Sequence, residues 1–121
     1  MNLIEEYKEL TKNCASTVYG DKKSVRLHNK SVKGMYEIVE KIGNEQTTET
    51  IKDFIKLLDI ADNSTNIWAA THLLERIPVD KKTEEKALSL IQKVASGESA
   101  ESMGFKLWLE EYHKRKSLFL Q

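Results

Sequence analysis

Apolar residues recur every three or four positions along most of the chain, the spacing that places them on one face of an α-helix. This periodicity predicts six helices, near residues 2–19, 22–42, 48–58, 65–77, 80–96 and 99–116. Glycine or proline marks four of the predicted helix ends, at Gly20, Gly43, Pro78 and Gly97. Asp21 is the predicted N-cap of the second helix, and the fifth begins at Asp80 or Thr83. No window alternates with the period of two that a strand requires, so we expect an all-α domain.

Short connections between the predicted helices indicate three antiparallel hairpins within one domain, residues 1–121. Two architectures fit such hairpins, a closed bundle and a short α-solenoid. The small pair Ala69-Ala70 in the middle of the fourth helix lets two helices approach closely, and a polar turn at residues 62–65 precedes that helix. This combination is similar to one HEAT repeat. The prediction is therefore a right-handed α–α superhelix of the HEAT/ARM type with about six helices.

A longer resemblance rests on the segment 67–74, with Trp68-Ala69-Ala70 followed by His72, and on the step Gly104-Phe105. Together with the helix that ends at Pro78, these residues resemble a bacterial family of small HEAT-like α-superhelical proteins, a domain of unknown function. The chain departs from that family at Thr65-Asn66, where a Val-Arg pair is usual, so no role of that arginine carries over. The resemblance implies a fold and a bacterial origin, and it implies no chemistry.

Composition supports a folded domain that lies in the cytoplasm. Of the 121 residues, 40% are hydrophobic and 31% are charged, with one Pro, which argues against a disordered chain. The longest apolar runs have three or four residues, far short of the roughly 20 that a membrane span needs. The beginning of the chain is acidic, unlike a secretory signal. Cys14 has no partner for a disulfide, and on the apolar side of its helix we expect it to act as a small hydrophobe.

Candidate catalytic or metal-binding groups are few. The chain has no glycine-rich phosphate loop and no serine in a nucleophile elbow. Two His/Glu pairs at a spacing of three residues, Glu110/His113 and His72/Glu75, could each offer two metal ligands. The second pair has the reverse order of a di-metal motif, and the first falls on the polar side of its helix, so we expect solvated ion pairs. We therefore predict no metal, no cofactor and no enzymatic activity.

Two further side chains, His28 and Trp68, can each be interpreted in more than one way. His28 projects within the apolar arc of the second helix, where we expect a half-buried histidine hydrogen-bonded to a neighbouring helix rather than a ligand or a base. Trp68 points away from the centre of the apolar arc of the fourth helix. It either packs on a neighbouring hairpin or forms an anchor on a binding face.

A basic stripe is the clearest electrostatic feature of a chain whose formal net charge is zero. On the second helix Lys23, Arg26, Lys30 and Lys33 share one face. Three interpretations remain: a solvated face in which Glu37 pairs with basic neighbours four residues away, a contact for an acidic protein surface, or a contact for nucleic acid. No aromatic residue interleaves with the stripe to stack on bases.

The predicted function is that of a non-enzymatic protein–protein interaction module. The second helices of the three hairpins, the second, fourth and sixth of the chain, are expected to line one face. The predicted partner-binding residues on it are Arg26, Lys30, Lys33, Trp68, His72 and Arg76. A sharper version is an immunity or antitoxin-type protein, and the alternative is nucleic-acid binding through the second helix. We expect a monomer or a weak homodimer, with the apolar tail 117–121 either packing on the core or marking a contact surface.

Overall fold

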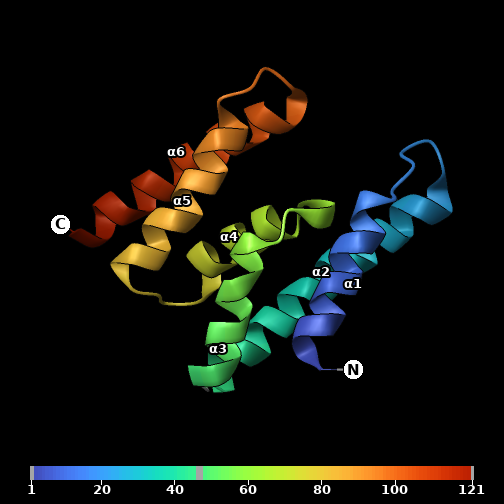
Figure 1. Ribbon diagram of the computed structural model, residues 1–121. Coiled ribbons are helices and arrows are strands. Elements are labelled where there is room, and N and C mark those ends of the chain that lie inside the picture. Colours follow the sequence, from blue (N-terminus) through green and yellow to red (C-terminus); the bar gives the residue numbers. More distant parts are fainter. Residues whose placement is uncertain (1, 46–47, 121) are drawn as a thin grey trace.

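The computed structural model describes residues 2–45 and 48–120, and within them it contains helices and no strand. The six α-helices are α1 (Leu3–Ala15), α2 (Lys22–Glu45), α3 (Thr48–Ile55), α4 (Thr65–Arg76), α5 (Lys81–Ala95) and α6 (Ala100–Leu120) (Figure 1). Two short 3₁₀ turns, η1 (Lys56–Asp59) and η2 (Asp62–Ser64), lie between α3 and α4. The predicted all-α class with six helices is confirmed. None of the described helices has the length and apolar composition needed to cross a membrane.

Helix α1 ends four residues earlier than its apolar periodicity predicts. Ser16 Oγ donates to the carbonyl of Asn13 at 3.0 Å, and Thr17 Oγ1 donates to the carbonyl of Cys14 at 2.8 Å. These hydroxyls bond carbonyls that another turn of helix would have used, so the backbone can leave the helix there. Val18 and Tyr19, predicted inside the helix, therefore lie exposed in the connection to α2.

Helix α2 runs through Gly43, where the prediction ended it. Val39 and Ile42 in the preceding turn are fully buried, and tertiary packing of this kind outweighs the modest cost of a glycine inside a helix.

The α-helix α3 is shorter than the sequence predicts. The predicted single helix 48–58 changes to the 3₁₀ turn η1 at Lys56, and Asn63 and Ser64 adopt positive φ angles of 57° and 56° before α4 begins.

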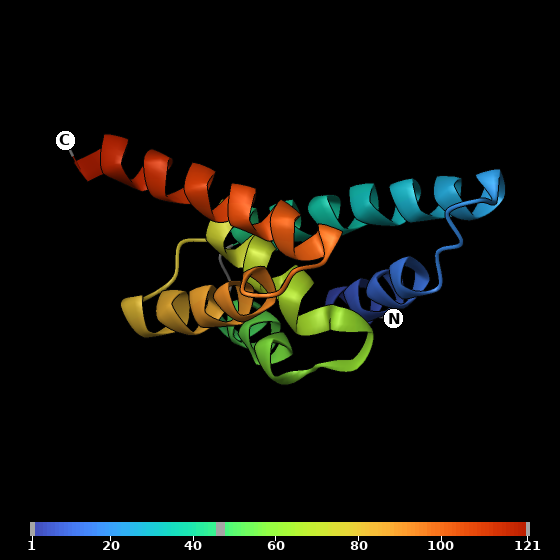
Figure 2. The same cartoon turned by 90° about the horizontal axis from the view of Figure 1, so that it is seen from above.

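Helix α4 is the centre of the packing. It contacts α1, α2, α3 and α5, while α1 pairs with α2 and α5 pairs with α6. Ala69 and Ala70 are fully buried, as expected of small residues at a close approach between helices. Figure 2 shows α2 and α6 along one side of the molecule, with α4 between them and with α1, α3 and α5 on the other side. The core around α4 includes Tyr7, Met35, Ile42, Phe54, Leu58, Leu73 and Ile91.

Candidate functional site

The side of the molecule formed by α2, α4 and α6 carries most of the residues predicted to bind a partner. We call it the α2/α4/α6 face. Arg26, Lys30 and Lys33 of α2 and Arg76 of α4 are exposed, and Trp68 of α4 is half-buried. The sixth residue, His72, is 1% exposed, so the prediction that it is presented on the surface is wrong. It lies instead beneath the face, among aromatic rings.

His72 is held by a hydrogen bond to Tyr7 of α1. Tyr7 Oη and His72 Nδ1 are 2.7 Å apart, and the bond is buried. Burial lowers the pKa of His72 to about 4, outweighing the nearby Glu75, which raises it. Burial also raises the pKa of Tyr7 well above its usual value. The bond therefore joins two neutral groups at pH 7, and its role is to connect α1 to α4.

Glu75 connects three helices through its two carboxylate oxygens. Tyr36 of α2 donates its hydroxyl to Oε2 at 2.9 Å, and Trp108 of α6 donates its indole N–H to Oε1 at 2.9 Å. Burial and this bond to Glu75 together raise the pKa of Tyr36. The sequence pattern places Glu75 next to His72 on one helix face and does not by itself reveal this bridge. The available signal was that buried tyrosine and tryptophan side chains need acceptors for their donors.

Four rings, two from α2 and two from α4, pack in a row between these helices. The ring centroids of His28 and Trp68 are 6.5 Å apart, those of Trp68 and His72 are 5.9 Å apart, and those of His72 and Tyr36 are 4.6 Å apart. The guanidinium of Arg76 lies over the ring of Tyr36 at 5.3 Å. Trp68 thus packs against α2, one of its two predicted roles, and its remaining surface is open to a partner.

His28 is half-buried, as predicted. Its Nδ1 lies 3.0 Å from Thr17 Oγ1, in the connection that follows α1, so the hydrogen bond goes to this connection and not to a helix. Cys14 is buried next to it, with its sulfur 4.0 Å from the His28 carbonyl oxygen, and burial raises the pKa of the thiol. The prediction that Cys14 acts as a small hydrophobe agrees with this placement, because a raised pKa keeps the thiol protonated.

The basic stripe on α2 is exposed and has no carboxylate partners among the described side chains. None of Lys23, Arg26, Lys30 and Lys33 forms an ion pair there; the pairs present involve lysines of other segments. The expected pairs of Glu37 with its basic neighbours are not formed. The exposed Leu27 lies within the stripe. This part of α2 therefore presents positive charge that no described side chain neutralises.

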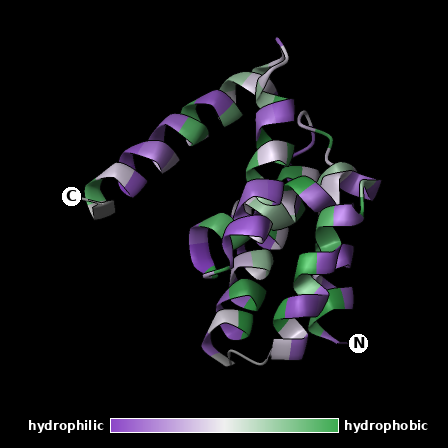
Figure 3. Ribbon diagram, turned by 60° about the vertical axis from the view of Figure 1, so that its left-hand side comes forward, coloured by the Kyte–Doolittle hydropathy of each residue, from purple (hydrophilic) through white to green (hydrophobic). Residues whose placement is uncertain are grey.

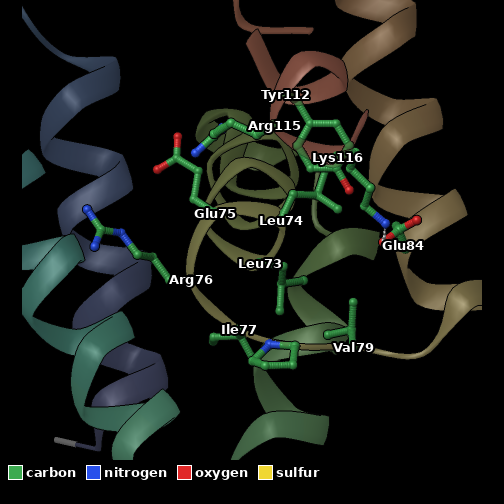
Figure 4. A pocket seen from close by; sticks show the side chains of 11 residues that line it. Leu73, Leu74, Glu75, Arg76, Ile77, Val79, Glu84, Tyr112, Arg115 and Lys116 are labelled. Atoms are coloured by element: carbon green, nitrogen blue, oxygen red, sulfur yellow. Dashed lines mark hydrogen bonds and ion pairs between the residues drawn. The ribbon is translucent and has the colours of Figure 1, made fainter. Parts of the chain in front are cut away.

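An open hollow of about 460 Å³ lies at the C-terminal end of α4, between the segment that follows α4 and helices α5 and α6 (Figure 4). Its apolar lining includes Leu73, Ile77 and Val79. Both carboxylates in its wall are occupied: Glu75 by the two donors described above, and Glu84 by Lys116 Nζ at 2.6 Å.

The two His/Glu pairs do not form ligand sets. His72 Nδ1 and both oxygens of Glu75 already have partners, and Glu110 and His113 are both exposed on α6. Within the part of the chain that the structure describes, no three His, Cys, Asp or Glu side chains gather where they could hold a metal ion.

Comparison with known proteins finds no relative of this chain. No protein-family model, no curated protein and no solved structure matches the chain. The resemblance to a HEAT-like bacterial family therefore stays a prediction.

Proposed function

We propose that this chain is a non-enzymatic protein-interaction module of the bacterial cytoplasm, and that the α2/α4/α6 face binds an acidic surface of a partner protein. The observation that carries the proposal is the group of unpaired cations exposed on α2, Arg26, Lys30 and Lys33, together with the half-buried Trp68 of α4. Tryptophan and arginine are among the residues most enriched at the energetic centres of protein interfaces. Unpaired cations attract an acidic partner and orient it.

The finer architecture that we propose is a right-handed HEAT-like superhelix of three hairpins, α1/α2, α3-η1/α4 and α5/α6. The pairing of α1 with α2 and of α5 with α6, and the contact of α4 with η1, support it. In a solenoid of this kind the second helices of successive hairpins form a continuous binding surface. That arrangement would account for the position of α4 between α2 and α6 (Figure 2).

The acid–base groups of α4 are already hydrogen-bonded to other helices, which favours a binding function over an enzymatic one. His72 and Glu75 are an imidazole and a carboxylate three residues apart on α4, and both take part in hydrogen bonds that connect helices. A catalytic base needs a free lone pair within reach of a substrate. Inhibition of a cognate toxin, as by an immunity or antitoxin-type protein, is the specific role that we propose, since it requires surface complementarity and no chemistry.

The experiment is a capture of partners from the native cytoplasm with three tagged proteins. These are the wild type, Arg26→Glu/Lys30→Glu/Lys33→Glu, and the matched control Lys81→Glu/Lys82→Glu/Lys93→Glu, which makes the same charge change at exposed positions of α5. We expect one protein to bind the wild type and the control and to be lost with the α2 variant. Binding of the same partner by the α2 variant would contradict the proposal.

Nucleic-acid binding is the second candidate, favoured by the same unpaired cations. It predicts that a fluorescent oligonucleotide binds the wild type and not the α2 variant. It also predicts that affinity falls on the order of a thousandfold between 50 and 200 mM salt for about six phosphate contacts. An affinity that does not change with salt would exclude this candidate.

A further inference from the structure

Helix α6 carries apolar residues on two opposite faces. Its inward face packs on the core through Phe105, Leu109 and Tyr112. On the other side Leu107 is 64% exposed and Leu118 is 73% exposed. These two leucines are eleven residues apart, which is about three helical turns, so they lie on one face. Figure 3 shows apolar positions recurring along α6, and Figure 2 shows this helix along an edge of the molecule with its C-terminal end projecting past the other helices.

Between the two leucines, four of the five charged residues follow an antisymmetric order, and the fifth, Lys116, bonds Glu84 of α5 instead. Glu110 and Glu111 come first, and Lys114 and Arg115 follow at mirror positions about the midpoint between Tyr112 and His113. All four charged side chains are exposed. Lys114 Nζ and Glu111 Oε1 are 3.9 Å apart in a solvent-exposed pair, which contributes little, so the four charges stay available to a partner.

We propose that this outward face of α6 binds α6 of a second copy of the chain, in antiparallel orientation about a two-fold axis. Such an arrangement reverses the order of the second helix. Leu107 then faces Leu118 of the second copy, Glu110 lies at the level of its Arg115, and Glu111 at the level of its Lys114. Because the contact is two-fold, each pair occurs twice.

The charge order selects this orientation over a parallel one. A parallel copy in register would bring each glutamate against its own equivalent, and like charges at an interface are unfavourable.

The contact involves one helix from each copy, and α6 is 21 residues long, or about 30 Å. A contact of this extent is at the small end of the range of buried areas in protein interfaces. We therefore expect a weak dimer, with a dissociation constant on the order of 10 μM to 1 mM.

The experiment is sedimentation equilibrium of purified full-length proteins across that concentration range. Glu110→Lys/Glu111→Lys makes all four charges positive, and Lys114→Glu/Arg115→Glu makes all four negative. Each variant is measured alone and in an equimolar mixture. Glu6→Lys/Glu9→Lys is the matched control, because it makes the same charge change at exposed positions of α1.

We expect the wild type and the α1 control to form dimers, and each α6 variant alone to dimerise at least about tenfold more weakly. The mixture restores the dimer, because positive residues of one variant then face negative residues of the other. A wild type that stays monomeric at every concentration overturns the proposal and leaves the face to a different partner. Dimers that persist in both α6 variants, or a mixture that stays monomeric, overturn it as well.

Discussion

Burial determines the charge state of His72, and this single residue makes the stability of the protein depend on pH. The folded state holds its pKa near 4, against an ordinary value of 6.5, because the ring is buried among α1, α2 and α4. In the unfolded chain the same imidazole is in water and titrates normally. As pH falls below 6.5, the unfolded state therefore binds a proton before the folded state does.

We predict that the free energy of unfolding falls by up to about 3 kcal/mol between pH 6.5 and pH 4 through His72. The measurement is urea denaturation across this range for the wild type and for Tyr7→Phe/His72→Phe, which removes both partners of the bond. The double variant should show a shallower decline. His113→Gln, at an exposed histidine of α6, should follow the wild type. Parallel curves for the wild type and the double variant would show that His72 does not carry the effect.

A second prediction concerns Tyr7 alone. Tyr7→Phe removes one partner and leaves a buried nitrogen of His72 without its hydrogen bond. An unsatisfied buried group costs about 1–3 kcal/mol, so the free energy of unfolding at pH 7 should fall by that amount. Tyr19→Phe makes the same chemical change at an exposed tyrosine and serves as the control, for which no loss is expected.

At the scale of elements, Glu75 is the connection between α6 and the rest of the α2/α4/α6 face. Helix α6 packs mainly on α5, and the bond from Trp108 to Glu75 ties it to α4 as well. The same carboxylate holds Tyr36 of α2. Hydrogen bonds to a charged group are stronger than those between neutral groups. We therefore expect the two bonds to Glu75 to contribute measurably to the free energy of unfolding.

We predict that Glu75→Ala lowers the free energy of unfolding by about 2 kcal/mol, because the Tyr36 and Trp108 donors lose a charged acceptor. In a Trp68→Phe background, Trp108 is the remaining tryptophan and its emission should shift to the red as α6 loosens. Glu111→Ala, at an exposed position of α6, should change neither property. An unchanged emission spectrum in Glu75→Ala would mean that packing on α5 alone positions α6.

At the scale of the molecule, stability is concentrated around α4 and declines toward the end of α6. Helix α4 contacts four other α-helices and both 3₁₀ turns, and it contributes Ala69, Ala70 and Leu73 to the core. Beyond Tyr112, the described side chains of α6 as far as Leu118 are exposed. A helical segment without buried contacts opens locally at low cost in free energy.

We predict that backbone amides of residues 114–118 exchange with deuterium on the order of a hundredfold faster than those of residues 69–73. Hydrogen-exchange mass spectrometry at low protein concentration, where a weak dimer dissociates, is the measurement. Equal protection of the two segments would contradict this account of the molecule.

The number of helices, most of their boundaries and much of the apolar core could be predicted from the sequence, because these depend on local periodicity and caps. Asp80, for example, is one of the two predicted starts of the fifth helix, and it accepts the N–H of Thr83 at 2.9 Å as the N-cap of α5. The exposed basic stripe on α2 and the buried position of Cys14 follow from the same pattern.

The partners of the polar side chains in the core become visible only when the helices are packed together. His72 bonds Tyr7, which is 65 residues away, and Glu75 joins Tyr36 and Trp108 from two other helices. A helical wheel places each side chain on a face of its own helix, and it does not reveal which neighbouring helix covers that face. For that reason the sequence placed His72 on the surface, while the packing of α1 and α2 around α4 buries it.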